Sequence, residues 1–176
     1  MKIPSVLLFA LPALAGNSTA QIPKPNQESY TITITISPTV VRTGSEVKLG
    51  IATKNISDQT IYHIVLTGKP GRYLDIAIRD SKGNPVQETP HGRKVHGTEL
   101  NRQPWSGSVF TGRYPIKPGE TFEETINLSQ EYDLSQPGTY SIQVLRSDVI
   151  TEHDIKTKLN TVAVAKSNMI ALTVTP

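Results

Sequence analysis

Hydrophobic and polar residues alternate over most of this chain, which indicates strands. The clearest stretch is 28–36, E-S-Y-T-I-T-I-T-I, in which Tyr30 and three isoleucines share one face and the threonines share the other. A period of two is typical of a strand with one buried face. Further strands are predicted at 46–54, 61–67, 73–79, 161–165 and 169–175, with Pro85-Val86 beginning a return strand after a hairpin turn.

The stretch 117–146 holds two Pro-Gly turns, and each turn begins an alternating strand. The first of these strands, 122–128, has Glu124 as the one polar exception on its otherwise hydrophobic face. Gly119 and Gly138 are expected to have structural roles, because glycine and proline are the residues that tight turns between strands favour.

Tyr140 and Ile142 suggest how the strands are arranged. In immunoglobulin-like sandwiches a tyrosine near the start of strand F donates its hydroxyl to the backbone of the preceding corner, and a core residue follows two positions later. Residues 132–134 would supply that corner; the alternative is that Tyr140 is an ordinary strand aromatic. With no convincing helix in the pattern, the prediction is all-β: a single antiparallel immunoglobulin-like β-sandwich of about 8–9 strands over residues 28–176.

The N-terminus has the features of a secretory signal peptide. Met1-Lys2 is followed by an apolar run over 3–15 and then by small residues, which predicts a signal peptide at 1–20 and a flexible leader at 21–27. The alternative is a retained anchor, but the run is shorter than the roughly 20 apolar residues that a membrane helix needs. We therefore expect an exported protein, periplasmic or extracellular, with no transmembrane segment in the mature chain.

Composition narrows the possible chemistry. The chain has no cysteine, which excludes disulfides, thiol nucleophiles and cysteine-ligated zinc, and which favours a bacterial source for an exported domain. Its net charge is +3, and the charged residues are scattered without long runs of one sign. No nucleic-acid partner is predicted, since such partners select for concentrated basic patches.

The segment 88–112 breaks the alternation and is the predicted binding loop. It is rich in glycine, proline and polar residues, and long irregular loops inside compact domains are commonly functional. An exposed Trp105 would make it a recognition surface, whereas a buried one would only anchor the loop. Segment 148–160 is expected to add a second contact if it lies at the same end. The candidate binding residues are Arg93, Lys94, His96, Arg102 and Trp105.

The sequence lacks the spacing that enzymes of the obvious classes require. No H-E-x-x-H pair of zinc ligands and no G-x-S-x-G nucleophile turn is present. His91 and His96 share one loop, but two ligands are few for a metal site, and both are expected to be solvated. We therefore expect no catalytic residue, no metal and no cofactor.

Two turns carry a family resemblance. Pro118-Gly119-Glu120 and Pro137-Gly138-Thr139-Tyr140 resemble the C-terminal half of BsuPI-type bacterial proteinase-inhibitor domains, over residues 117–146. The segment Tyr132-Asp133-Leu134-Ser135 before the second turn also looks like the N-terminal β-sandwich of deuterolysin-like metallopeptidases. The inhibitor resemblance implies a peptidase as partner.

Taken together, these features predict an exported, non-catalytic β-sandwich that binds another protein, with peptidase inhibition as the form that the resemblance implies. The first alternative is a structural or accessory module of the cell envelope that pairs through an edge strand such as 28–36. A hydrolase with an unrecognised site is the less favoured third hypothesis.

Overall fold

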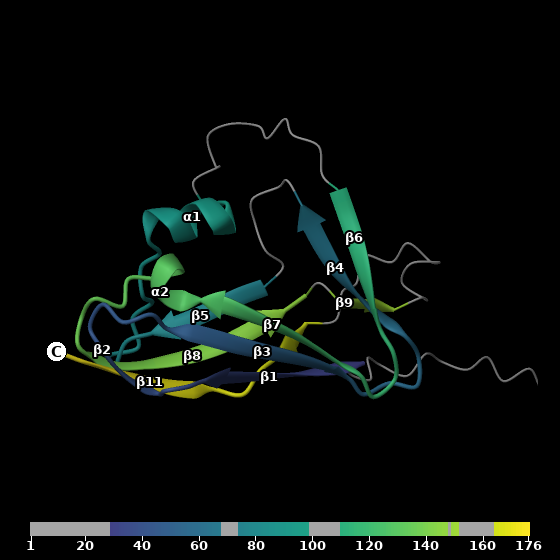
Figure 1. The fold of residues 1–176 in the computed structure, drawn as a ribbon, viewed down its shortest axis with the longest axis horizontal. Coiled ribbons are helices and arrows are strands. Elements are labelled where there is room, and N and C mark those ends of the chain that lie inside the picture. The colour runs from purple at the N-terminus through teal and green to yellow at the C-terminus, as the bar shows by residue number, and fades with distance from the viewer. Residues whose placement is uncertain (1–28, 68–73, 99–109, 148, 152–163) are drawn as a thin grey trace, which may run out of the picture.

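The computed structural model of the chain describes residues 29–67, 74–98, 110–147, 149–151 and 164–176 (Figure 1). Eleven strands and two short helices lie in these residues. They are β1 Tyr30–Ile36, β2 Val40–Arg42, β3 Lys48–Asn55, β4 Ile61–Thr67, β5 Leu74–Arg79, α1 Pro90–His96, β6 Phe110–Ile116, β7 Thr121–Asn127, α2 Leu128–Glu131, β8 Gly138–Arg146, β9 Val149–Thr151, β10 Ala165–Lys166 and β11 Ile170–Thr175.

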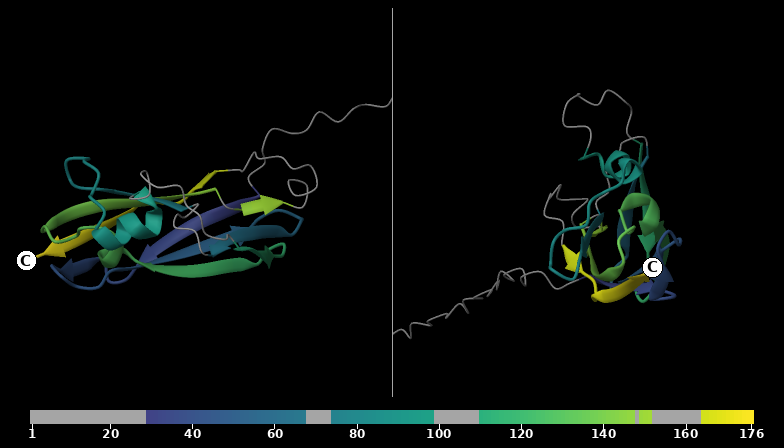
Figure 2. Two further views of the ribbon diagram at one scale, coloured as in Figure 1. Left: turned by 90° about the horizontal axis from the view of Figure 1, so that it is seen from above. Right: turned by 90° about the vertical axis from the view of Figure 1, so that its left-hand side faces the viewer.

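Two sheets pack face to face as a β-sandwich of immunoglobulin-like type (Figure 2). The first sheet has the antiparallel order β1-β3-β7. The second has the order β10-β8-β11-β2, with β5 also paired to β8. All its pairings are antiparallel except β2 with β11, which is parallel. A third group of strands has the antiparallel order β6-β4-β9.

The predicted alternation produces the core. β1 has the burial pattern BeBeBeB, so its tyrosine and isoleucines are buried and its threonines are exposed. Strands β5 and β8 bury every second residue in the same way. Both sheets therefore turn one apolar face inward, and burial of that surface stabilises the sandwich. Fully buried members include Leu49, Ile61, Leu128, Ile142, Val144 and Leu172.

An ion pair crosses this apolar interior. Arg146, at an inward position of β8, is only 1% exposed, and its guanidinium Nη2 bonds the Oε1 of Glu124 on β7 of the opposite sheet. Arg146 Nη1 also lies 3.4 Å from Nδ1 of His63 on β4. The backbone carbonyl of Arg146 accepts a 3.0 Å hydrogen bond from the hydroxyl of Tyr30 on β1. Glu124, the one polar residue on the otherwise hydrophobic face of its strand, is thus the partner of a buried arginine.

The predicted tyrosine corner is present. The hydroxyl of Tyr140 donates a 2.5 Å hydrogen bond to the carbonyl of Gln136, four residues upstream and just beyond the expected residues 132–134. Ile142, two positions later, is fully buried, as expected of the core residue. Gly119 has a φ of 78°, in the left-handed region that glycine favours, and Gly138 opens β8 as the second Pro-Gly turn requires.

Buried polar side chains bind backbone groups where strands end. The Asn55 amide donates to the carbonyls of Gln59 and Ile116, and its oxygen accepts from the backbone of Ser57. On the edge of β1, the side-chain amide of Asn168 accepts from the Ile34 N–H at 2.8 Å and donates to the Ile34 carbonyl at 3.1 Å. The centre of the β1 edge is thus already paired.

Three sequence-based expectations need correction. Helices were not predicted, yet α1 lies in the segment interpreted as an irregular loop and α2 follows β7 directly. The return strand at Pro85-Val86 is reduced to one isolated bridge from Arg79 to Pro85. The segment 88–112 is also not one loop, because β6 begins at Phe110.

Replacing Glu124 by Gln is expected to lower the free energy of unfolding by about 3 kcal/mol, because it removes the countercharge of a buried arginine. Glu123→Gln is the matched control: Glu123 is the exposed neighbour on the same strand, and its change should stay within about 0.5 kcal/mol. Urea denaturation of both variants measures the difference. Equal stabilities would show that the ion pair contributes nothing.

Candidate functional site

The helix α1 is defined by its own end signals. Thr89 precedes it in an extended conformation, and its Oγ1 accepts a 3.0 Å hydrogen bond from the N–H of Gly92. Pro90 occupies the first turn, where its missing N–H costs nothing. Gly97 ends the helix with a φ of 76° and donates its N–H to the carbonyl of Arg93. These capping contacts hold seven residues helical between β5 and a segment outside the described residues.

The helix is fixed on α2 through backbone contacts. The N–H of Thr89 donates to the carbonyl of Glu131 at 2.9 Å, and the Thr89 hydroxyl donates to the carbonyl of Gln130 at 2.5 Å. Gly92 is buried so closely against Glu131 that a Cβ there would collide with its carbonyl oxygen. We name residues 88–98, resting on α2, the α1 platform; Figure 1 shows it on the outside of the sandwich.

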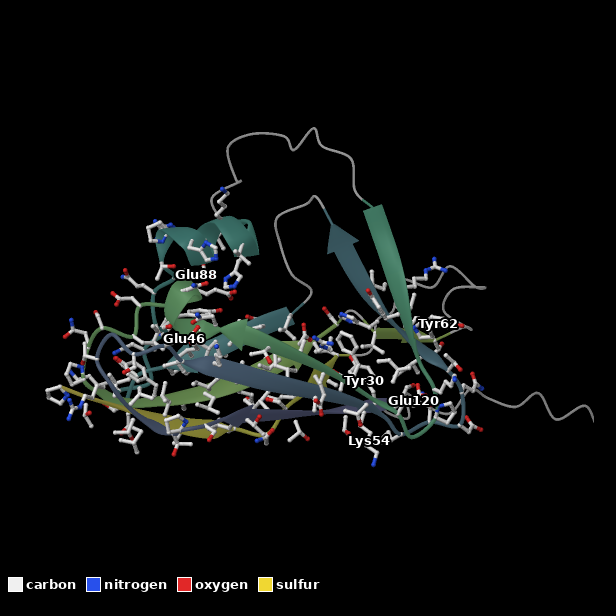
Figure 3. The ribbon with its side chains drawn as sticks, viewed as in Figure 1. Tyr30, Glu46, Lys54, Tyr62, Glu88 and Glu120 are labelled. Atoms are coloured by element: carbon white, nitrogen blue, oxygen red, sulfur yellow. The ribbon has the colours of Figure 1, made fainter. Side chains whose placement is uncertain are left out.

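His96 connects the platform to the sandwich. Its Nδ1 lies 2.5 Å from Oε1 of Glu88, and its Nε2 lies 3.0 Å from Oε2 of Glu131. Glu131 is 4% exposed, and the imidazole lies beside the ring of Tyr132, with ring centroids 5.4 Å apart. Because each ring nitrogen faces a carboxylate oxygen, both hydrogen bonds form only when the imidazole carries two protons. Figure 3 shows Glu88 between the two helices.

The charges at this contact support one another. The hydrogen bond to Glu131 raises the pKa of His96 above its ordinary value of 6.5; burial opposes this, and the bond to Glu88 adds to it. Burial alone would raise the pKa of Glu88, but hydrogen bonds from His96 and Thr98 outweigh it and lower that pKa below 4.5. Thr98 makes its bond to Oε2 of Glu88 at 2.7 Å. The raised pKa of His96 and the lowered pKa of Glu88 both favour the ion pair between the imidazolium and the Glu88 carboxylate.

A pocket of about 250 Å³ opens beside this cluster. Leu74, Asp75 and Ile76 of β5 form one wall. Across from them, the pocket is lined by Glu88, His96 and Tyr132. The hydroxyl of Tyr132 reaches across and donates to the carbonyl of Ile76 at 3.1 Å. The α1 platform thus leaves a recess between itself and the edge of the second sheet.

The structure describes three of the five predicted binding residues. Arg93 and Lys94 lie on α1; Lys94 is exposed, while Arg93 is half-buried and donates from Nη1 to the carbonyl of Glu88 at 3.0 Å. His96 differs from the expectation of a solvated histidine, since it is half-buried and bonds two carboxylates. Arg102 and Trp105 lie outside the described residues. Whether Trp105 is exposed for recognition or buried as an anchor therefore stays a prediction.

The structure also bears on the predicted second contact, on metal binding and on membrane spans. The described part of the predicted second contact, β9, lies toward the opposite end of the sandwich from α1 (Figure 1). Within the described residues, no three histidine or acidic side chains are arranged to hold a metal ion. His91 is exposed on the platform, and His96 has both ring nitrogens engaged by carboxylates. Among the helices described, none is long and apolar enough to cross a membrane.

Sequence reasoning missed the residues that make the site. Glu88, Glu131 and Tyr132 were not named as binding residues. A contact such as that of His96 with Glu131, 35 positions apart, leaves no periodic signal in the sequence. The helix itself did carry signals: Thr89-Pro90 at its start, Gly97 at its end, and basic residues in its last turn. The abundance of glycine and proline led to the loop prediction instead.

Comparison with known proteins gives similarities of architecture only. No protein-family model and no curated protein matches the chain. Similar solved structures include the CARDB domain of a Pyrococcus furiosus protein in complex with di-metal ions (14% identity, TM-score 0.35, covering 84% of this chain and 90% of that one). Another is the ASH or PapD-like domain of human CEP192 (9% identity, TM-score 0.33, covering 97% and 94%).

A β-glucosidase from Listeria innocua in complex with gluconolactone is also similar, at 13% identity and a TM-score of 0.38 over 84% of this chain. This chain spans only 16% of the β-glucosidase. Similarities of this size say nothing about what the present chain binds, and the BsuPI-type resemblance has no match among them.

Replacing Gly92 by Ala should detach α1 from α2, because the added methyl group meets the backbone of Glu131 and not a movable side chain. We expect the free energy of unfolding to fall by about 1–3 kcal/mol, as in other overpacked sites. His91→Ala, on the exposed surface of the same helix, should change stability by less than about 0.5 kcal/mol. Indistinguishable denaturation curves for Gly92→Ala and the native chain would show that the contact between Gly92 and the Glu131 backbone is not tight.

The stabilising effect of His96 should depend on pH. Because its folded-state pKa is raised, its contribution is complete below the unfolded pKa of 6.5 and is lost as the pH rises through the folded-state value. Glu88, with a lowered pKa, contributes fully above 4.5 and loses its effect at lower pH. The stability difference between the native chain and His96→Gln should therefore be largest from about pH 4.5 to 6.5. A constant difference from pH 5 to 9 would contradict this.

Proposed function

We propose that this chain is a non-catalytic β-sandwich domain that binds another protein through the α1 platform. The observation that carries the proposal is the fixation of α1 by His96 between Glu88 and Glu131. A segment that merely connects β5 to β6 needs no buried charge cluster, and burying charges is costly unless they are paired and hydrogen-bonded. A rigid helix on the outside of the sandwich instead presents a surface of defined shape.

The charge of the platform suggests the character of its partner. Arg93 and Lys94 lie in the last turn of α1, with exposed His91 on the same helix. Arg93 is oriented by its bond to the backbone of Glu88, so less side-chain entropy is lost when it binds. Arginine is enriched at the energetic centres of protein interfaces. The partner surface is therefore expected to be acidic.

A non-catalytic role is supported by the state of the platform histidine. Both ring nitrogens of His96 are bound to carboxylates, so it lacks the free basic nitrogen that a general base requires. The hydrolase hypothesis would have to depend on residues elsewhere in the chain. No contact in the α1 platform favours it.

Pairing through β1 was the main alternative, and the structure supports it less well. The side-chain amide of Asn168 already bonds both the N–H and the carbonyl of Ile34 at the centre of that edge. An incoming strand would have to displace these two hydrogen bonds. The α1 platform requires no such rearrangement.

Two finer parts of the proposal depend on the sequence alone. Export rests on the apolar run at 3–15 and the small residues before Gln21, with a periplasmic or extracellular destination. Peptidase inhibition rests on the two turns that resemble BsuPI-type domains. Inhibition assays against representative serine, cysteine and metallo-peptidases, with and without the Arg93 and Lys94 side chains, would test it directly.

The double variant Arg93→Ala/Lys94→Ala should lose the partner while remaining folded. Truncation of a central interface arginine commonly weakens binding by more than about tenfold. Lys54→Ala/Lys117→Ala is the control, because it removes the same charge at the opposite end of the sandwich, where Figure 3 shows Lys54.

Capture from envelope and culture-supernatant fractions, followed by calorimetric titration of the captured protein, measures the difference. Loss with the platform variant and retention with the control variant is the expected result. Equal binding by both variants would place the partner surface elsewhere and refute the platform proposal.

A further inference from the structure

The pocket beside His96 lies where a β-hairpin separates. β5 and the segment after it begin as paired neighbours: Arg79 bridges Pro85, and the N–H of Val86 donates to the carbonyl of Ile78 at 2.9 Å. The segment then leaves β5 and pairs with the end of α2, through a bridge from Glu88 to Tyr132. In the part of the chain that the structure describes, no strand neighbours the edge of β5 at Leu74–Ile76, where the pocket opens.

The register of β5 shows which backbone groups face this pocket. Ile76 is paired with Val144 of β8, whose N–H and carbonyl both bond Ser167 on the far side. The two residues therefore form a non-hydrogen-bonded pair, and the polar groups of Ile76 point away from β8. Tyr132 confirms this by donating to the Ile76 carbonyl. Leu74, two residues earlier, has the same orientation.

Two edge groups are therefore available to a partner. Among the described residues, the N–H of Ile76 and the carbonyl of Leu74 have no hydrogen bond. They flank Asp75. In a parallel ladder, one residue of the incoming strand donates its N–H to the carbonyl before its counterpart and accepts from the N–H after it. An antiparallel strand would instead need the Ile76 carbonyl, which Tyr132 already occupies.

The residue opposite Asp75 would also meet a carboxylate. Asp75 is exposed and lines the pocket, and its carboxylate has no hydrogen bond or ion pair among the described residues. Side chains of directly paired residues lie on the same face of a sheet, and opposite charges there attract. The other charged side chains of the pocket, Glu88 and His96, bond each other. A positively charged side chain is therefore the complement of this site.

We propose that the slot between β5 and the α1 platform binds an extended peptide segment, which adds to β5 as a short parallel strand and places an arginine or lysine opposite Asp75. Strand addition of this kind obtains affinity from backbone hydrogen bonds and selectivity from alternate side chains. The inference deepens the proposed function and rests on it, since it names the chemistry of one part of the partner.

The test uses the native chain and an acetylated pentapeptide, Thr-Val-Arg-Val-Thr, followed by the backbone amide signals of the protein in NMR. We expect saturable shifts of the Ile76 amide at millimolar peptide, with the Gly119 amide at the far end unchanged. N-methylation of the central arginine should weaken binding about tenfold, because it removes the donor to Leu74. N-methylation of either flanking valine should have little effect, since those N–H groups point away from β5.

Charge reversal provides an independent readout. A peptide with glutamate at its centre should bind the native chain at least about threefold more weakly, and Asp75→Lys should reverse that preference. The control Lys82→Ala, at an exposed turn, should leave it unchanged.

An unshifted Ile76 amide, equal effects of central and flanking N-methylation, or an unchanged preference in Asp75→Lys would each overturn the slot proposal. If the peptide fails while partner capture still requires Arg93 and Lys94, the proposed function stands without the slot. If the peptide does not bind and partner capture does not require Arg93 and Lys94, the slot proposal and the proposed function are both wrong.

Discussion

The ion pair between Glu124 and Arg146 is the interaction on which the arrangement of the two sheets depends. Arg146 is buried on the second sheet, and its countercharge comes from the first, so separating or sliding the sheets would leave a charge in an apolar interior. Apolar packing alone tolerates small shifts, because it has no direction. A guanidinium-carboxylate contact has a defined geometry and therefore sets the position of β7 against β8.

The same arginine brings further strands into register. Its backbone carbonyl receives the Tyr30 hydroxyl from β1, and its side chain reaches His63 on β4. His63 in turn lies against Phe122 of β7, with ring centroids 4.6 Å apart. Four strands thus meet at one polar cluster near the place where β8 gives way to β9. Ser167 and Asn168, which lie between β10 and β11, similarly join β8 to β1, because Ser167 bonds Val144 and Asn168 bonds Ile34.

Side chains, more than strands, close the edges of these sheets. Asn168 pairs with the edge of β1 at Ile34, and Tyr132 pairs with the edge of β5 at Ile76. Exposed edges invite unwanted strand pairing, and natural proteins cover them in several ways. The edge of β5 differs, because it is covered only in part. Tyr132 bonds the Ile76 carbonyl but not the Ile76 N–H or the Leu74 carbonyl, which flank Asp75. An incompletely covered edge next to the α1 platform is the feature on which the proposed peptide binding rests.

The alternation of residues predicted most of the sandwich, since a period of two follows directly from strand geometry. β4 was predicted with its observed bounds, and β1 and β11 to within two residues at either end. The tyrosine corner was also predictable, because both its donor and its acceptor lie within one turn of the chain. The burial of Arg146 was also predictable, because Arg146 continues the inward series of Tyr140, Ile142 and Val144. Glu124 is likewise the one charged residue on the inward face of β7.

The site was much less predictable, for a physical reason. Arg93, Lys94 and His96 were selected by composition, but the partners of His96 come from Glu88 and from Glu131 on α2, and only the fold brings these together. Local capping signals in Thr89 and Gly97 could have revealed α1, yet nothing local reveals that Gly92 fits against the Glu131 backbone. Pairing between distant segments, and not propensity, decides such contacts.

The charge cluster around His96 and the slot share their structural components, so we expect the two to act together. Glu88 accepts from His96 on the platform and at the same time forms a wall of the pocket, as Tyr132 does below it. Loss of either imidazole proton would break the hydrogen bond of His96 to one carboxylate and loosen the wall of the slot as well as the helix above it. Binding along β5 and docking of α1 on α2 should therefore be energetically coupled, and by linkage each would stabilise the other.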